Sequence, residues 1–231
     1  MLKVDPTLQS NADILQVEIP DTWGPKRTNI KFGPYQLMNT EKGITQRTTV
    51  SSDELNLLES IISKHPTDSS IKKMKATHTY QFSDGGKTPW NAHCIQLKVE
   101  REVRHKNAVS MEPMHIQYSC EYTRAGSESW VLLIEKQKSN ILEARMLGDG
   151  TEFVAKASKG VYVKPDGTEY RGLTPVDTGF NWSEDNALVG AVSIRTKAPR
   201  VWLHKKKSAA HKNALAMASA GLLIYHWKIA R

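Results

Sequence analysis

The sequence predicts a mainly β fold, an antiparallel meander closed into a barrel or folded into a sandwich. One internal helix and a long C-terminal helix are expected to pack on it. Apolar and polar residues alternate with period two over residues 74–82, 94–99 and 115–122. This alternation is typical of strands with one face buried and the other in water. Short turn sequences separate these segments, which favours hairpin connections.

A chain of 231 residues accommodates one large β domain. No low-complexity run or Pro/Gly/Ser-rich spacer divides it. We therefore expect residues 1–27 to form an N-terminal extension. Residues 28–231 should form a single β-rich domain of about a dozen strands.

Turn residues mark the ends of the expected strands. The sequence Asp-Gly-Thr at 149–151 is echoed at 166–168. Asp-Gly favours the positive φ values of a tight hairpin turn. Two successive hairpins are therefore predicted between about 140 and 171, and further turns are predicted at 84–86 and 183–186.

Two helices are expected. Ser51 and Glu54 have the spacing of a capping box, and an apolar stripe follows them until Pro66 ends the internal helix. The C-terminal helix should cover about 207–228 and is apolar on most of its circumference, which is typical of a helix buried on several sides. Gly221 costs it roughly 1 kcal/mol relative to Ala. A close backbone approach at Gly221 would offset that cost.

Positive charge is concentrated at the C-terminal end. The formal net charge is +8, and residues 186–231 contain nine Lys/Arg and no Asp/Glu. The preceding 185 residues hold 23 basic and 24 acidic groups. Any anion-binding surface is therefore expected near this end. The candidate residues are Arg200, Lys205, Lys206, Lys207 and Lys212.

A solvated collar around the apolar helix is the simpler interpretation of these charges. Aromatic residues are not interleaved with them, as they are in proteins that bind single-stranded nucleic acid. We therefore do not expect a nucleic-acid partner.

Cys94 and Cys120 lie on two predicted neighbouring strands, and their midpoint, Asn107, falls in the expected connection. A symmetric hairpin would place them opposite one another, so a disulfide is favoured over two buried thiols or a nucleophile. Their faces conflict, because Cys120 alternates with Tyr118 on an apolar face while Cys94 alternates away from Ile95. A one-residue bulge between the cysteines would reconcile the faces.

Histidines suggest a metal hypothesis. His78, His93 and His115 fall on predicted strands near the cysteines, and three such ligands could converge on an ion. Hydrogen-bonded or surface histidines are the favoured interpretation. The motifs of zinc metalloproteases, serine hydrolases and dinucleotide-binding proteins do not occur. No catalytic residue, metal site or cofactor is therefore predicted.

Several stretches resemble an uncharacterised family of proteobacterial cell-envelope proteins, often lipoproteins in their full form. They are Phe-Gly-Pro-Tyr at 32–35, the strand at 130–134, Asn-Ala-Leu-Val-Gly-Ala-Val at 186–192, Val-Trp-Leu at 201–203 and the closing helix. The resemblance covers most of the chain after Thr28. It implies export to the periplasm or cell envelope and supplies no reaction. The N-terminus has no apolar segment typical of a secretory signal, so the cytoplasm is the alternative.

Three functional hypotheses follow. The first is a non-enzymatic cell-envelope protein, an interaction or binding module that uses a sheet edge or its basic end. Its partner would be an anionic membrane surface or another envelope protein. The second is a lipocalin-like carrier of a small apolar ligand, with Trp182, Trp202 or Tyr225 near the ligand. The third is an enzyme of unrecognised type, supported only by the His/Cys neighbourhood.

Overall fold

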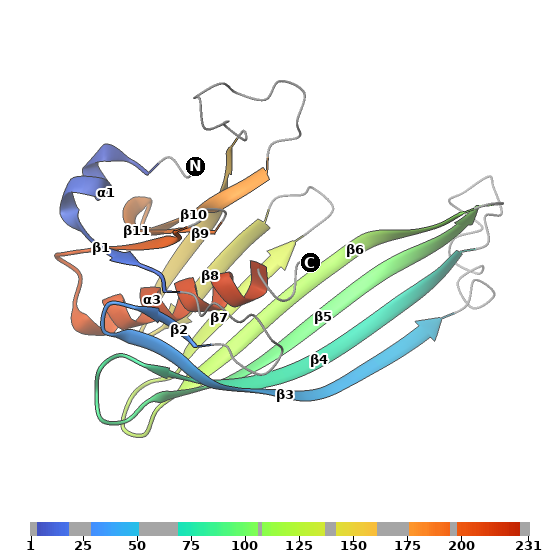
Figure 1. Cartoon of the computed structure of the whole chain (residues 1–231), viewed down its shortest axis with the longest axis horizontal. Helices are drawn as coiled ribbons and strands as arrows, with labels where there is room; N and C mark the ends of the chain where they lie inside the picture. Colours follow the sequence, from blue (N-terminus) through green and yellow to red (C-terminus); the bar gives the residue numbers. More distant parts are fainter. Residues whose placement is uncertain are drawn as a thin grey trace.

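The computed structural model shows a 12-stranded antiparallel sheet that curls into a nearly closed barrel (Figure 1). The structure describes residues 4–18, 29–50, 69–105, 108–136, 142–160, 176–194 and 198–226. Strands β2 to β12 neighbour one another in chain order, and β1 pairs with β12 at the far edge. The predicted antiparallel meander is therefore confirmed.

The strands are β1 (Ala12–Gln16), β2 (Ile30–Phe32), β3 (Tyr35–Val50), β4 (Ser69–Ser83), β5 (Trp90–His105), β6 (Ala108–Thr123), β7 (Trp130–Lys136), β8 (Leu142–Gly148), β9 (Thr151–Gly160), β10 (Val176–Glu184), β11 (Ala187–Ser193) and β12 (Arg200–His204). The helices are α1 (Pro6–Asn11) and α3 (Ala209–Ile224). The internal helix expected after Ser51 lies outside the described residues.

The two edges of the sheet approach each other between β1 and β2. The Glu18 amide donates to the Lys31 carbonyl at 2.7 Å, and the Lys31 amide donates back at 3.3 Å. Strand β1 thus belongs to the barrel and α1 packs on β11 and β12, whereas the sequence predicts an N-terminal extension over 1–27. Helix α1 and strand β1 are only six and five residues long, too short to give a clear periodic signal.

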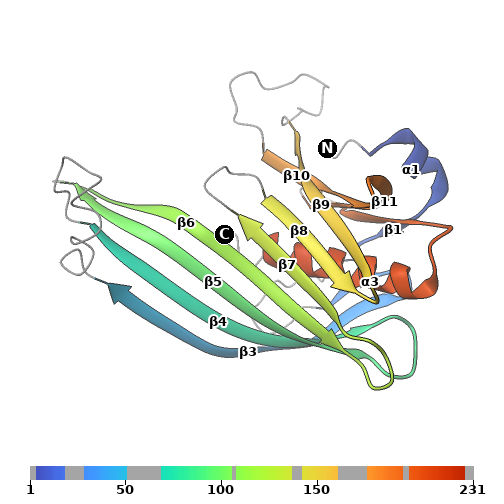
Figure 2. The same cartoon turned by 180° about the vertical axis from the view of Figure 1, so that it is seen from behind.

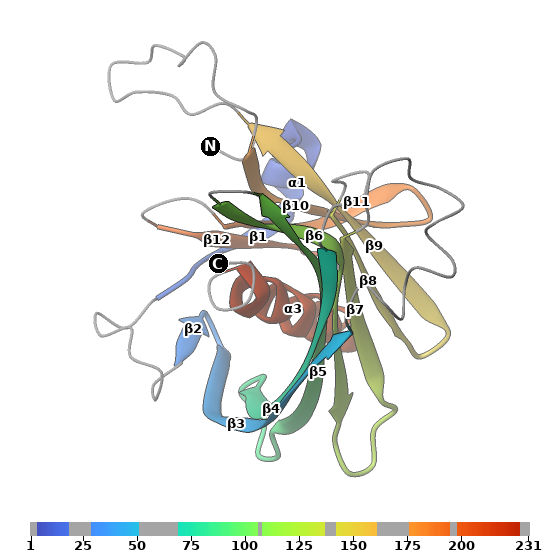
Figure 3. The ribbon, with the colours of Figure 1, turned by 90° about the vertical axis from the view of Figure 1, so that its right-hand side faces the viewer.

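Helix α3 lies inside the barrel, with strands around it (Figure 3). Every residue from Ala214 to Tyr225 is buried, as the apolar circumference predicted. The helix begins after Ser208, whose side chain accepts a hydrogen bond from the His211 amide at 3.2 Å. Its described span, Ala209–Ile224, lies within the expected 207–228.

Strands β3 to β6 are far longer than the barrel requires. Each has 15 or 16 residues, and together they run past the barrel as a projecting sheet (Figures 1 and 2). We call this projection the arm: β3 from Glu41, β4 up to Thr77, β5 from Leu97 and β6 up to His115. The arm is the part of the sheet that α3 does not line.

Turn residues behave as predicted where the structure describes them. Asp149 and Gly150 have φ values of 49° and 63°, and they join β8 to β9. Asp185 and Asn186 have φ values of 49° and 66° between β10 and β11. Residues 84–86 lie in the β4–β5 connection. The second Asp-Gly turn, at 166–168, lies outside the described residues.

Candidate functional site

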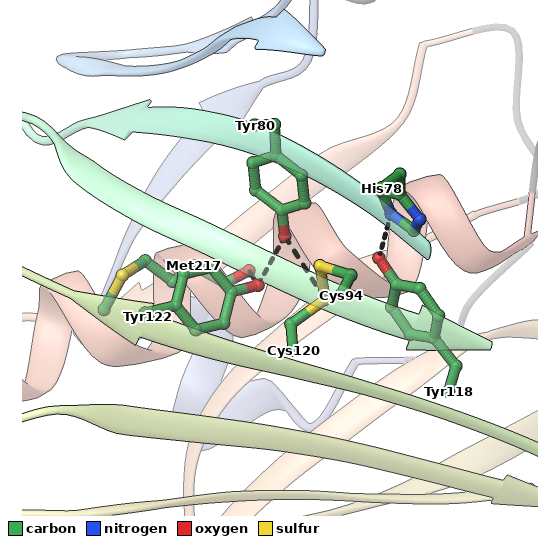
Figure 4. Close-up of a disulfide and its surroundings, with 7 residues drawn as sticks. All are labelled: His78, Tyr80, Cys94, Tyr118, Cys120, Tyr122 and Met217. Carbon is green, nitrogen blue, oxygen red and sulfur yellow. Dashed lines mark hydrogen bonds between the residues drawn. A yellow bond between two sulfur atoms is a disulfide. The ribbon is translucent and has the colours of Figure 1, made fainter. Parts of the chain in front are cut away.

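A disulfide joins Cys94 to Cys120 where the arm leaves the barrel (Figure 4). The two residues are directly opposite on β5 and β6, and both are fully buried. The register does shift by one residue between the two cysteines along the hairpin, at Val99/Glu100, but this bulge is not what places both cysteines on the inward face. The inward face of β5 carries Ala92 and Cys94, while Ile95 points the other way.

The conflict of faces expected from the sequence has a physical cause. Leu97 shares the outward face with Ile95 and is 37% exposed, so apolar residues line the solvent side of β5. The inward side carries the buried polar Gln96. Periodicity alone therefore assigned the wrong face to this strand.

A chain of tyrosine hydroxyls connects the disulfide region to α3 (Figure 4). The Tyr80 and Tyr122 hydroxyl oxygens are 2.6 Å apart, and the Tyr122 hydroxyl donates to the Met217 carbonyl at 3.1 Å. Tyr80 Oη also lies 3.9 Å from Cys120 Sγ. These contacts hold β4, β6 and α3 together, and they satisfy hydroxyls that would be costly to bury unpaired.

Burial raises the pKa of Tyr80, Tyr118 and Tyr122 well above the ordinary value of a phenol. Desolvation is the main cause, since an ionised phenolate would lose its hydration inside the barrel. Burial also raises the pKa of Tyr35 to about 12, and the nearby carboxylates of Asp84 and Asp13 add to the rise. These hydroxyls therefore act as neutral hydrogen-bonding groups at physiological pH.

The three histidines do not converge. His78 Nε2 lies 2.9 Å from the Tyr118 hydroxyl, and the two rings stack with centroids 5.5 Å apart. His93 follows the inward-facing Ala92 and lies on the opposite face, and His115 pairs with Val99 further along the arm. Of the three histidines, only His78 approaches the cysteines. A ring nitrogen of His78 and the sulfur atoms of Cys94 and Cys120 all lie within 4.8 Å of one another. Because both sulfurs are in the disulfide, neither offers a thiolate as nucleophile or metal ligand.

The arm presents a long exposed edge on β3. β2 pairs with β3 only from Tyr35 to Leu37, so within the described chain the rest of β3 has a strand neighbour on one side only. Residues 41–49 are all exposed, and Ile44 is 72% exposed. The register shifts twice before Thr45, and then 45–50 pair regularly with β4.

Charges on the two faces of the arm differ in their partners. On the face that continues the barrel interior, Lys72 pairs with Glu102, and Lys98 pairs with Glu100 at 2.7 Å. Lys73 and Lys75 point to the opposite face of β4 from Lys72, and both are exposed there. Basic character is thus not confined to the C-terminal end. The net charge of residues 1–185 does not reveal these lysines, because acidic residues elsewhere in that part of the chain cancel their charge.

The five predicted anion-binding residues do not form one site. Lys207 pairs with Glu184, and Lys212 Nζ lies 3.1 Å from Asp13 Oδ2. Arg200 begins β12, whereas Lys205 and Lys206 follow the other end of that strand. Within the described part of the chain Arg200, Lys205 and Lys206 have no ion pair, and of these Lys205 and Lys206 form the adjacent, exposed pair.

The aromatic residues expected near a carried ligand are also separated. Trp182 is buried in the main core. Trp202 packs in a second cluster with Leu8 beneath α1. Tyr225 at the end of α3 lies 6.0 Å from Tyr118 between ring centroids. Because α3 occupies the interior, these residues fill the structure rather than surround a ligand.

No protein-family model, curated protein or solved structure matches this chain. Among the described residues, no helix is both long and apolar enough to cross a membrane. The interpretation of function therefore depends on the geometry of the molecule itself.

Proposed function

We propose that this protein is a non-enzymatic cell-envelope binding protein whose arm engages a partner protein by strand addition at β3. The exposed edge of β3 carries this proposal. A strand edge without a neighbour presents backbone N–H and C=O groups that can pair with an added strand. Residues 45–50 supply a regular stretch of such an edge beyond the two register shifts.

Charge around this edge favours an acidic partner segment. Lys73 pairs in register with Thr48, and Lys75 pairs with Gln46. Arg47 lies between these two edge residues in the strand, points to the opposite face of the sheet, and is exposed. A strand added beside β3 would therefore have Arg47 as a direct neighbour on one face, and Lys73 and Lys75 one strand further away on the other face, which favours Asp and Glu in that strand.

The base of the arm is braced. The disulfide ties β5 to β6, and the tyrosine chain ties β4 and β6 to α3. A rigid base limits the conformational entropy lost on binding. The disulfide also supports an oxidising compartment, in agreement with the periplasm or cell envelope expected from the resemblance.

The other two functional hypotheses gain less support. A lipocalin-like carrier needs a lumen, and here α3 occupies it with side chains that are 2% exposed or less from Ala214 to Tyr225. An enzyme built on the His/Cys neighbourhood needs a thiolate or a metal, and both sulfurs are in the disulfide.

Site-specific photo-crosslinking tests the proposal. A photoreactive phenylalanine analogue replaces Gln46 or Thr48 in cells that produce the protein, and crosslinked products are identified by mass spectrometry. The matched control carries the analogue at Leu147, an exposed residue on β8. We expect the same partner at both edge positions and none at the control. Edge positions that give no product, or the same products as the control, would refute strand addition at β3.

A further inference from the structure

A polar hollow of about 670 Å³ opens on the outer face of the sheet, at the barrel end of β3. It forms where β3 departs from regular pairing between Met38 and Glu41. Asn39 has φ 54° there, a left-handed conformation that asparagine tolerates better than most residues. The volume lies within the range of about 300–1,000 Å³ that small-molecule sites occupy.

Side-chain amides from three strands form a chain across the floor of the hollow. Asn39 Nδ2 donates to Gln81 Oε1 at 2.6 Å, and Gln81 Nε2 donates to Asn91 Oδ1 at 3.3 Å. The two ends of this chain are the side-chain carbonyl oxygen of Asn39 and the side-chain amide nitrogen of Asn91. The orientation of each amide group follows from the hydrogen bonds between them. One end can therefore accept and the other can donate.

Thr40 adds an independent observation. Its hydroxyl oxygen is buried and has no hydrogen-bond partner in the described structure. Buried hydroxyls are normally paired, so one left unpaired in the wall of a hollow is a candidate contact for a bound molecule. Thr79 and Thr123 contribute further hydroxyls to the lining.

We propose that this hollow is a binding site for a neutral saccharide. A sugar hydroxyl both donates and accepts, and so do the amide and threonine groups that line the hollow. Glu41 and His93 complete the polar lining. The Glu41 carboxylate can accept hydrogen bonds from adjacent sugar hydroxyls, which are stronger when the acceptor is charged.

Other ligand classes fit less well. No Lys or Arg is among the described residues that line the hollow, so a phosphate or carboxylate ligand would have no cationic partner. The lining residues Tyr80 and Ala92 belong to the barrel core, so their side chains are unavailable to a lipid. Glu41 is the one carboxylate among the described lining residues, fewer than a calcium site usually has.

NMR of side-chain amides tests the inference on the full chain. Maltotriose, cellotriose and triacetylchitotriose are each titrated to about 20 mM, a concentration that detects dissociation constants in the millimolar range. We expect at least one of them to shift the Asn39, Gln81 and Asn91 side-chain amide resonances saturably. Asn91→Ala should weaken that binding at least about fivefold, or about 1 kcal/mol, the value of a typical hydrogen bond.

Gln117→Ala is the matched control, because Gln117 is an outward-facing amide on β6 away from the hollow. It should leave the affinity unchanged. Absence of saturable shifts with all three saccharides would overturn the inference, as would equal binding by the Asn91→Ala variant. Shifts produced by calcium chloride alone, without any saccharide response, would assign the hollow to a cation instead. Because the hollow does not include residues 45–50, this result is separable from the crosslinking result at β3.

Discussion

Gly221 of α3 lies directly against Leu132 of β7. A Cβ atom at Gly221 would be 2.3 Å from Leu132 Cδ2 and 3.1 Å from the Tyr122 hydroxyl oxygen. The helix can approach the wall of the barrel this closely only because Gly221 has no side chain. The same approach lets the Met217 carbonyl accept from Tyr122.

Gly221→Ala should therefore destabilise the protein. Overpacking of a well-packed core costs about 1–3 kcal/mol, which outweighs the roughly 1 kcal/mol that Ala gains over Gly in a helix. Chemical denaturation measures the change in the free energy of unfolding. A double-mutant cycle with Leu132→Ala is the control, since the smaller residue makes room for the new methyl group. Full additivity of the two changes would show that the clash with Leu132 is not the cause.

The disulfide should contribute substantially to stability. It closes a sequence separation of 26 residues, for which loop entropy predicts about 3.5 kcal/mol. Replacing both cysteines (Cys94→Ala/Cys120→Ala) should lower the denaturation midpoint by a corresponding amount. Dithiothreitol should lower the midpoint of the wild-type protein and leave that of the double variant unchanged. Equal midpoints for oxidised and fully reduced wild type would contradict this expectation.

Much of the barrel could be predicted because its strands obey simple rules. Alternation identified β4 and β6, and the Asp149-Gly150 dipeptide located the β8–β9 turn. The opposition of Cys94 and Cys120 followed from hairpin symmetry alone. Each of these features depends on residues close in sequence, where local chemistry dominates.

Other features depend on distant contacts that sequence patterns do not report. β1 is a short strand that becomes part of the barrel only by pairing with β12, almost 190 residues later along the chain. The ion pairs of Lys207 with Glu184 and of Lys212 with Asp13 are likewise long-range. These ion pairs neutralise two of the basic residues near the C-terminal end, which the sequence shows only as a cluster of positive charge. The polar hollow requires the β3 irregularity at Asn39, for which no motif was available.

Alkaline pH should weaken the fold through the buried tyrosines. Burial raises the pKa of Tyr80, Tyr118 and Tyr122 in the folded state, whereas in the unfolded chain these phenols ionise near their usual value of about 10. Their contribution is therefore fully present below about pH 10 and is lost as pH rises above it. Each phenol that stays protonated while folded lowers the free energy of unfolding by about 1.4 kcal/mol per pH unit above that point.

The variant Tyr80→Phe isolates this effect. It should reduce the fall in the free energy of unfolding between pH 10 and pH 11 by about 1 kcal/mol, since the unfolded phenol is already half ionised at pH 10. At pH 7 it should cost about 1 kcal/mol for the lost hydrogen bond to Tyr122. Absorbance at 295 nm follows ionisation in the same samples. Phenolate formation near pH 10 by all tyrosines of a protein that remains folded would contradict the expected shifts.

The basic end should bind anionic membranes only weakly. Lys207 and Lys212 are engaged in ion pairs, which leaves Lys205 and Lys206 as the exposed charges of the predicted set near α3. Each basic residue near an anionic surface contributes about 1 kcal/mol, and salt screens that attraction beyond about 8 Å at physiological ionic strength. Co-sedimentation with phosphatidylserine vesicles should therefore show retention at low salt that disappears at about 0.15 M.

Charge reversal separates the basic end from the arm. Lys205→Glu/Lys206→Glu should abolish the low-salt retention if the basic end carries it. Lys73→Glu/Lys75→Glu reverses two charges on the arm that are also exposed, and it is the matched control. Loss of retention only in the arm variant would move the anionic contact to the outer face of β4. Retention that persists at physiological salt in the wild type would mean that a surface larger than two lysines meets the membrane, contrary to the ion pairing seen at Lys207 and Lys212.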